Sequence, residues 1–323
     1  MKKTCVALSC LMLITILFSD VSAAEKVNFY ANITAIEPIM ENFNATHDIQ
    51  GIYTRISTSK YLATVLTEFS AGKLQADVLQ GPLPIMQILK EKGVLAPYRS
   101  PSAVGYPAWA LEDDIIIQFG VEYVAPIYNK DLVKPEDVPT RYEDLTDPKW
   151  HDKIVMPDPA SHATTISWLV GLKEAGIFGN DDAWLAFVKG LAANKPMFVS
   201  SFGPTPAPIE SGQKLIGISM PKYIITKAPA PLDWARVDTI MGTPRGIAIA
   251  AKAPNPEAAK VFVDYWLSKN AMQLLADKVG EYVLAPGVYP PIADIETAKI
   301  LPIRTLSDDE ISQWGKEFRK IFY

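Results

Sequence analysis

The first part of the chain alternates short apolar runs with segments whose apolar residues recur every three or four positions. Such runs predict strands, and such spacing predicts helices with one buried face. Strands are predicted at 27–31, 49–56 and 76–79. Helices are predicted at 35–44, after the turn at 57–59, and at 84–91. This alternation is typical of a parallel sheet whose strands are connected by helices.

A second region repeats the alternation, with strands predicted at 153–156, 197–200 and 215–219 and helices at 163–174 and 181–192. Apolar runs at 115–119 and 121–128 predict two strands that pass from the first region into the second. A strand at 245–251 leads back, and helices at 256–269 and 271–279 follow it. The pattern therefore predicts two α/β units joined by crossing strands.

Two such units form lobes with a cleft between them. We place residues 24–118 and 244–286 in lobe 1, and residues 119–243 and 287–323 in lobe 2. The carboxyl ends of strands and the N-termini of helices line clefts of this kind, and ligands bind there. We therefore expect the interlobe cleft to be the functional site.

The N-terminus has the pattern of a secretory signal peptide. Lys2 and Lys3 precede an apolar run at 6–18, and Val21-Ser22-Ala23 fits a small-residue cleavage site. The alternative is a membrane anchor, but the run is shorter than the roughly 20 residues needed to span a bilayer. Residues 1–23 are thus predicted to be a cleaved signal peptide that directs the chain to the periplasm.

Composition narrows the chemistry of the predicted mature chain. Both cysteines, Cys5 and Cys10, lie in the signal peptide, so the mature chain has no thiol for a disulfide, a nucleophile or a metal. The full chain has 31 basic and 36 acidic residues. Because this balance is acidic and the sequence has no basic stripe, we expect no nucleic-acid partner.

The turns between strands and helices carry the candidate ligand-binding residues. Each turn places hydroxyl or amide groups beside the free N–H groups of a helix start, where anions bind, although each alone also fits an ordinary N-cap. Cations and tyrosines near other predicted strand ends complete the set. The candidates are Asn32, Thr34, Thr58, Ser59, Gln80, Tyr123, Ser161, His162, Thr164, Thr165, Lys222, Tyr223, Arg245 and Tyr282.

Catalytic and metal-binding signatures are absent from the sequence. It contains no G-x-S-x-G, H-E-x-x-H, Walker or G-x-G-x-x-G motif. Its histidines, His47, His151 and His162, are too widely spaced to form a recognisable metal motif. We therefore predict no enzyme activity, no cofactor and no resident metal.

Several stretches carry a family resemblance. They are YNKDLVKPEDVP at 128–139, YEDLTDPKW at 142–150, IVMPDP at 154–159, APNPEAAKVF at 253–262 and GEY at 280–282. With the N-terminal strand–helix order, they resemble the periplasmic substrate-binding proteins of ABC importers, in the branch that includes ferric-iron binders. The resemblance implies a monomeric type II periplasmic-binding-protein fold, in which each lobe is a mixed, mainly parallel sheet flanked by helices. It also implies that the lobes close on a hinge and deliver a solute to a membrane permease.

The resemblance also bears on the ligand. Iron-binding members have tandem tyrosines where this chain has Lys222-Tyr223, and often a histidine and a glutamate where it has Asn32 and Gln80. Bare ferric iron needs several anionic oxygen ligands, which these positions do not supply. The loop after Asp158-Pro159 corresponds to the family's anion-holding turn, so we favour an organic anion such as a carboxylate, phosphonate or phosphate ester.

Two alternatives stay open at this stage. The first is a ferric-iron receptor that uses Tyr223, Tyr282, His162 or a synergistic anion. The second is a secreted enzyme on the same fold.

Overall fold

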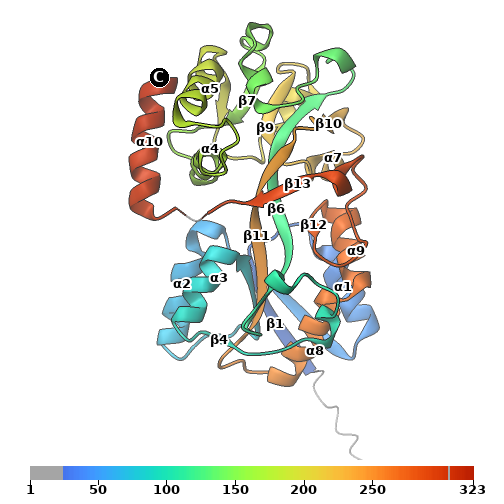
Figure 1. Ribbon diagram of the computed structural model, residues 1–323. Coiled ribbons are helices and arrows are strands. Elements are labelled where there is room, and N and C mark those ends of the chain that lie inside the picture. The colour runs from blue at the N-terminus through green and yellow to red at the C-terminus, as the bar shows by residue number, and fades with distance from the viewer. Residues whose placement is uncertain (1–24, 305) are drawn as a thin grey trace, which may run out of the picture.

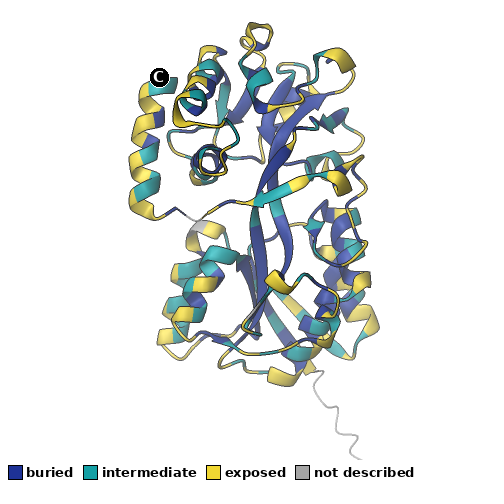
Figure 2. Ribbon diagram, in the orientation of Figure 1, coloured by how far each residue is buried: buried dark blue, intermediate teal, exposed yellow. Residues whose placement is uncertain are grey.

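The computed structural model describes residues 25–304 and 306–323, so the predicted signal peptide lies outside the described residues. Two lobes are stacked one above the other (Figure 1). The long strands β6 (Ile116–Asn129) and β11 (Thr239–Ala250) pair antiparallel and run through both lobes. Both are buried along most of their length (Figure 2), which explains their nearly continuous apolar sequences.

Lobe 1 is built on the sheet order β2-β1-β3-β11-β6. Strands β1 (Glu25–Ala31), β2 (Ile49–Arg55) and β3 (Val78–Pro82) are parallel, and β11 is antiparallel to β3. Helices α2 and α3 cover one side of the sheet, and α1, α8 and α9 cover the other (Figure 1). These helices are α1 (Glu37–Thr46), α2 (Thr58–Ser70), α3 (Leu83–Glu91), α8 (Pro256–Leu267) and α9 (Lys269–Leu274).

Lobe 2 contains the parallel strands β7 (Ile154–Pro157), β8 (Met197–Val199) and β9 (Ile216–Ser219). Strand β9 pairs antiparallel with β6, which joins this sheet to the hinge. Its main helices are α4 (Ala163–Glu174), α5 (Asp181–Ala193) and α10 (Asp308–Phe322). Trp168 of α4, Val188 of α5 and Phe318 of α10 are fully buried in one apolar core.

Short elements complete the two lobes. The remaining strands are β4 (Leu95–Ala96), β5 (Leu111–Glu112), β10 (Leu232–Trp234), β12 (Tyr282–Val283) and β13 (Lys299–Pro302). Helices α6 (Pro206–Glu210) and α7 (Tyr223–Thr226) are short, and a π-helical turn spans Leu275–Val279. Single 3-10 turns lie at Pro101–Ala103, Ala108–Ala110, Pro135–Asp137, Tyr142–Thr146, Pro148–Trp150 and Ile295–Thr297.

The predicted α/β architecture is confirmed, with one correction at the hinge. The runs at 115–119 and 121–128 are not two strands but the single strand β6. Gly120 interrupts the apolar pattern because a Cβ atom there would lie 2.9 Å from the backbone oxygen of Tyr282. The proposed lobe boundaries near 118 and 243 therefore fall within β6 and β11. Among the described residues, no helix is long and apolar enough to cross a membrane.

Candidate ligand-binding site

A buried arginine stands at the point where the lobes meet. Arg245 lies on β11, and its side chain is 3% exposed. Its Nη2 is 2.8 Å from Oε1 of Glu122 on β6, and its Nε is 2.7 Å from Oε1 of Glu281. Its Nη1 donates a hydrogen bond of 3.0 Å to Oδ1 of Asn32, just after β1. Nε and Glu281 Oε1 are in ion-pair contact but not aligned for a hydrogen bond. Arg245 thus joins the hinge strands to the end of β1.

Lys222 of lobe 2 shares one of these carboxylates. Its Nζ lies 3.7 Å from Glu122 Oε1, and the two side chains are 14% and 22% exposed. This distance is longer than a hydrogen bond, so the ammonium keeps unused donors. Glu122 therefore stands between a closely paired cation of the hinge, at 2.8 Å, and a more distant cation of lobe 2, at 3.7 Å.

The pKa values of the two carboxyl groups that contact Arg245 shift in opposite directions. Burial by itself raises the pKa of Glu122, but the charges of Arg245 and Lys222 offset this and hold that pKa below its usual range. Burial raises the pKa of Glu281, and Arg245 offsets only part of the rise. Glu122 is thus the carboxylate that keeps its negative charge more strongly.

The start of α4 contributes from lobe 2. His162 caps the helix: its Nδ1 accepts from the N–H of Thr165 at 3.3 Å and lies 2.9 Å from the Thr165 hydroxyl oxygen. Burial lowers the pKa of His162, although the charges of Glu122 and Asp158 oppose the shift. The first two N–H groups of α4, on Ala163 and Thr164, have no acceptor among the described residues.

The loop before α4 is held by its own aspartate. Asp158 accepts hydrogen bonds of 2.8 Å from the Ala160 N–H and from the Ser161 hydroxyl. The Ser161 hydroxyl is thus engaged, and Thr165 is fully buried. Thr164 is half-buried, and no described residue forms a hydrogen bond with its hydroxyl.

Lobe 1 supplies amide and hydroxyl groups. Nδ2 of Asn32 donates to the Thr58 hydroxyl oxygen at 3.0 Å, and Oε1 of Gln80 accepts from the Ile33 N–H at 3.3 Å. Nε2 of Gln80 is buried and has no acceptor among the described residues. Buried donors almost always have a partner, so this one is available to a ligand or a water molecule. Thr34 is exposed, and the backbone of Ser59 lies in the first turn of α2.

The candidate tyrosines divide between the two faces of the hinge strands. Burial, reinforced by the charge of Glu122, raises the pKa of Tyr223 to about 12. Tyr123 alternates with Glu122 along β6, so it points to the other face, where its hydroxyl donates to Gly280 O at 3.2 Å. Tyr282 pairs opposite Val121 and lies on that same face. Tyr123 and Tyr282 are therefore separated from the Arg245–Glu122 pair.

Two residues of the polar cluster were not predicted from the sequence. Glu122 and Glu281 were not among the candidates, yet both form ion pairs with Arg245. Glu122 did carry a signal, because it is a lone charge inside an apolar strand and such residues are rarely buried without a partner. Among the described residues, no group of three or more His, Cys, Asp or Glu side chains is placed to hold a metal ion.

The largest cavity described lies elsewhere. It has a volume of about 740 Å³ and includes Val121, Pro244 and Tyr282 in its lining. Val121 and Pro244 alternate with Glu122 and Arg245 along their strands, so this cavity opens on the opposite face of the hinge. We place the candidate site at the polar cluster because residues of both lobes meet there with charges and unused donors.

Comparison with a protein-family model identifies the family of this chain. The model for bacterial extracellular solute-binding proteins matches residues 39–302, and the chain belongs to that family. This confirms the predicted relationship.

Relatives and a solved structure add detail. The chain is 28% identical over 228 residues to a probable ABC transporter periplasmic-binding protein of Sinorhizobium fredii, covering 66% of this chain and 61% of that protein. It is 29% identical over 184 residues to iron uptake protein A1 of Synechocystis, covering 50% and 48%. The matches thus span less than two thirds of these relatives.

The solved structure is a periplasmic binding protein from Actinobacillus pleuropneumoniae with exogenous fructose-6-phosphate bound. It superposes with a TM-score of 0.68 at 20% identity, covering 93% of this chain and 97% of the other. This likeness confirms the predicted type II periplasmic-binding-protein fold.

Proposed function

We propose that this chain is the periplasmic receptor of an ABC importer, which captures a small organic anion between its lobes and delivers it to a membrane permease. The predicted signal peptide and the family support export to the periplasm. The role is binding and delivery, with no chemical step on the ligand.

The observation that carries the proposal is the unused donor capacity of Lys222. Its ammonium faces Glu122 at 3.7 Å and its side chain is 14% exposed, whereas the Arg245 side chain is 3% exposed and is paired with two carboxylates. Lys222 would bind the anionic group of the ligand, and the free N–H groups at the start of α4 would assist. Gln80 would donate its buried amide from lobe 1. Closure of the lobes would bring these donors onto one ligand.

The charge of Glu122 narrows the class of ligand. A carboxylate beside the anion-binding lysine favours a ligand that also carries hydroxyl or amino donors for it to accept. Phosphorylated sugars and hydroxy acids combine these groups, and the Actinobacillus neighbour was solved with a sugar phosphate. A carboxylate, phosphonate or phosphate ester with neighbouring donors therefore fits the cluster.

The iron uptake relative favours a second candidate, a ferric-iron receptor. If such a receptor used Tyr223 as a ligand, that phenol would have to ionise, and its raised pKa makes ionisation costly. Iron would have to displace its proton in a half-buried position. The organic anion requires no such step.

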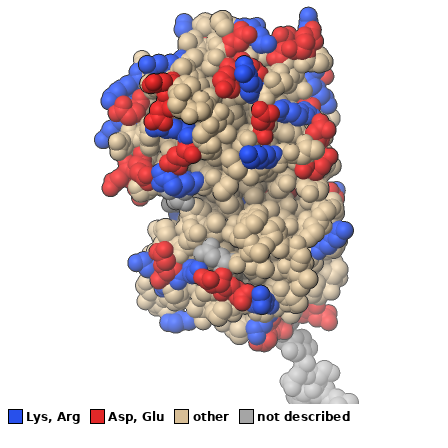
Figure 3. Space-filling model, viewed as in Figure 1, with Lys and Arg blue, Asp and Glu red and all other residues tan. Residues whose placement is uncertain are grey.

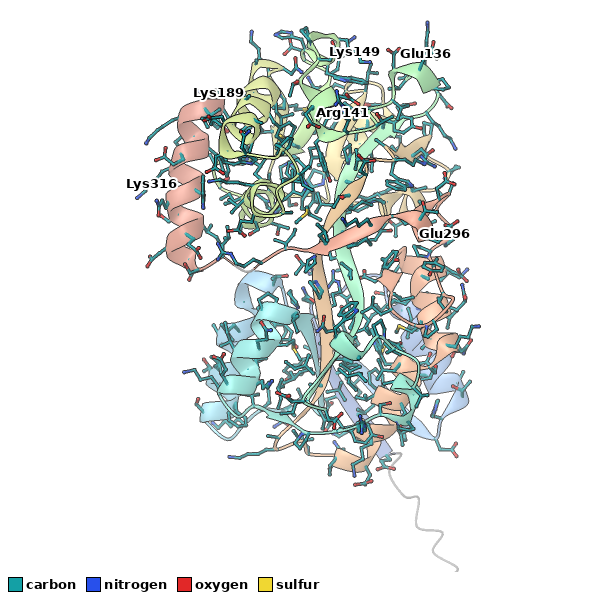
Figure 4. The ribbon with its side chains drawn as sticks, in the orientation of Figure 1. Glu136, Arg141, Lys149, Lys189, Glu296 and Lys316 are labelled. Carbon is teal, nitrogen blue, oxygen red and sulfur yellow. The ribbon has the colours of Figure 1, made fainter. Side chains whose placement is uncertain are left out.

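The test is binding by the purified mature protein. Native mass spectrometry detects any co-purified ligand, and thermal shift compares fructose 6-phosphate, methylphosphonate, succinate and ferric nitrilotriacetate. Calorimetry on the best organic ligand then compares Lys222→Ala with Lys189→Ala. The labelled Lys189 is exposed near the outer end of lobe 2, away from lobe 1 (Figure 4), so it is a matched control.

We expect Lys222→Ala to weaken binding by roughly tenfold or more, and Lys189→Ala to leave the Kd unchanged. A thermal shift with ferric iron alone, accompanied by a visible tyrosinate colour, would establish the iron receptor instead.

A further inference from the structure

The cavity of about 740 Å³, named here the outer hinge cavity, lies on the face of β6 and β11 opposite the polar cluster, and β13 supplies part of its lining. Leu83 and Trp109 line it from lobe 1, Tyr282 and Tyr289 from the segment after the π-helical turn, and Ile300 from β13. None of its described lining residues is charged. Figure 3 shows the same character at the surface, where the area between the lobes on this face has few coloured charges.

This cavity is separate from the candidate ligand-binding site. Strands β6 and β11 stand between them, since Val121 and Pro244 face the cavity while Glu122 and Arg245 face the polar cluster. A ligand in one place does not touch the side chains that bind in the other. The two sites are therefore chemically independent, although the same hinge strands form a wall of each.

Aromatic rings left open to solvent mark the rim of the cavity. Trp109 is 60% exposed and Tyr289 is 42% exposed, and the ring centroid of Tyr289 lies 5.9 Å from that of Tyr282. Gln118 is the polar exception: its Nε2 donates to Trp109 O at 3.2 Å, and no described residue donates to its Oε1. An apolar, aromatic lining with a few polar groups is the usual composition of a small-molecule pocket.

From these features we propose that the outer hinge cavity is a second binding site, for an uncharged, mainly apolar small molecule with an aromatic ring. The volume falls within the range of about 300–1,000 Å³ that such sites occupy. A charged ligand would lose its hydration without gaining a counter-charge from the lining. An aromatic ligand would cover Trp109 and Tyr289 and stack on their rings.

The test uses N-phenyl-1-naphthylamine, an uncharged aromatic probe that fluoresces in apolar surroundings. We expect saturable binding of one probe per chain. Trp109→Ala and Tyr289→Ala should each weaken it by roughly fivefold or more. Both side chains are substantially exposed, so these variants should keep the fold.

Two controls separate this site from other surfaces. Leu132→Ala removes an exposed apolar side chain of lobe 2 that does not line the cavity, and it should leave the probe Kd unchanged. Lys222→Ala should leave it unchanged too, whether or not the proposed anion binds the cleft.

Several results would overturn the proposal. They are non-saturable fluorescence, equal Kd values in the wild type and both aromatic variants, or loss of probe binding in Lys222→Ala. Sedimentation velocity tests the other occupant, a second copy of the chain. A dimer that dissociates in Trp109→Ala would show that protein, rather than a small molecule, covers this face.

Discussion

We expect the buried charge of Arg245 to contribute strongly to the stability of the fold. Removing the guanidinium would leave the carboxyl groups of Glu122 and Glu281 facing each other without the cation between them. Loss of one partner of a buried ion pair typically costs about 3–5 kcal/mol, because the remaining charge stays desolvated. We therefore expect Arg245→Met to lower the free energy of unfolding in urea by that amount.

The matched control is Arg99→Met. Arg99 pairs with Asp114 at 3.3 Å, but its side chain is 78% exposed. Exposed pairs contribute about 0–1 kcal/mol. If both variants unfolded at the same urea concentration, burial would not be what makes Arg245 important.

Gly120 permits the close approach of two backbone segments. A methyl group there would lie 2.9 Å from the backbone oxygen of Tyr282, which cannot move without shifting β12. Overpacking of this kind costs about 1–3 kcal/mol. Gly120→Ala should therefore lower the melting temperature clearly. Gly203→Ala is the control, since its added methyl group would meet nothing closer than 3.9 Å; an equal loss in both variants would refute the explanation.

At the scale of elements, α10 depends on its first turn. Ser307 Oγ accepts from the Glu310 N–H at 3.3 Å, and Glu310 Oε2 accepts from the Ser307 N–H at 2.8 Å, which forms a capping box. Arg304 also holds the carboxylate at 2.9 Å. Hydrogen bonds from Arg304, and then from Ser307, lower the pKa of Glu310 to about 2.

This pKa gives a pH dependence with a defined sign. The folded state has the lower pKa, so the stability from Glu310 is present above the unfolded pKa of about 4.3 and is lost as the pH falls towards about 2. The melting temperature of the wild type should exceed that of Glu310→Gln near neutral pH. The difference should shrink below about pH 4.3. A constant difference over the whole range would mean that the charge of Glu310 does not stabilise the helix.

Local signals decided which elements the sequence could predict. The predicted helix at 163–174 is α4, since His162 caps it and the apolar run ends before Gly176. Helix α10 was not predicted, although Ser307 and Glu310 have the spacing of a capping box. The two strands predicted around Gly120 are one, because only the fold shows why a glycine is needed inside β6.

The candidate site was predictable only where local patterns mark it. Asn32 follows β1, and Gln80 follows the strand predicted at 76–79, although it lies inside the longer strand β3. The order of elements was therefore enough to nominate both residues. Glu122 and Glu281 depend on Arg245, and Glu122 is more than a hundred residues away from it in sequence. No local sequence pattern predicts an ion pair between residues that far apart. The antiparallel register of β6 and β11 brings Glu122 and Arg245 together.

For the whole molecule, the hinge strands connect the two lobes, so closure of the lobes should change the overall dimensions of the protein. Among the described residues, β6, β11 and their immediate partners join the sheets of the two lobes, so a ligand held by Gln80 and Lys222 would draw the lobes together. Binding then shifts the population towards the closed form by the difference in affinity between the two forms. We expect the best organic ligand of the thermal-shift panel to lower the radius of gyration in small-angle X-ray scattering.

The variants make this measurement specific. At a ligand concentration that saturates the wild type, Lys222→Ala should remain more open, whereas Lys189→Ala should close as the wild type does. Raising the ligand concentration by roughly the factor lost in affinity should restore closure in Lys222→Ala, because the substitution weakens binding without blocking the hinge. A variant that binds at the higher concentration and still stays open would show instead that Lys222 acts on the hinge, through its shared carboxylate Glu122.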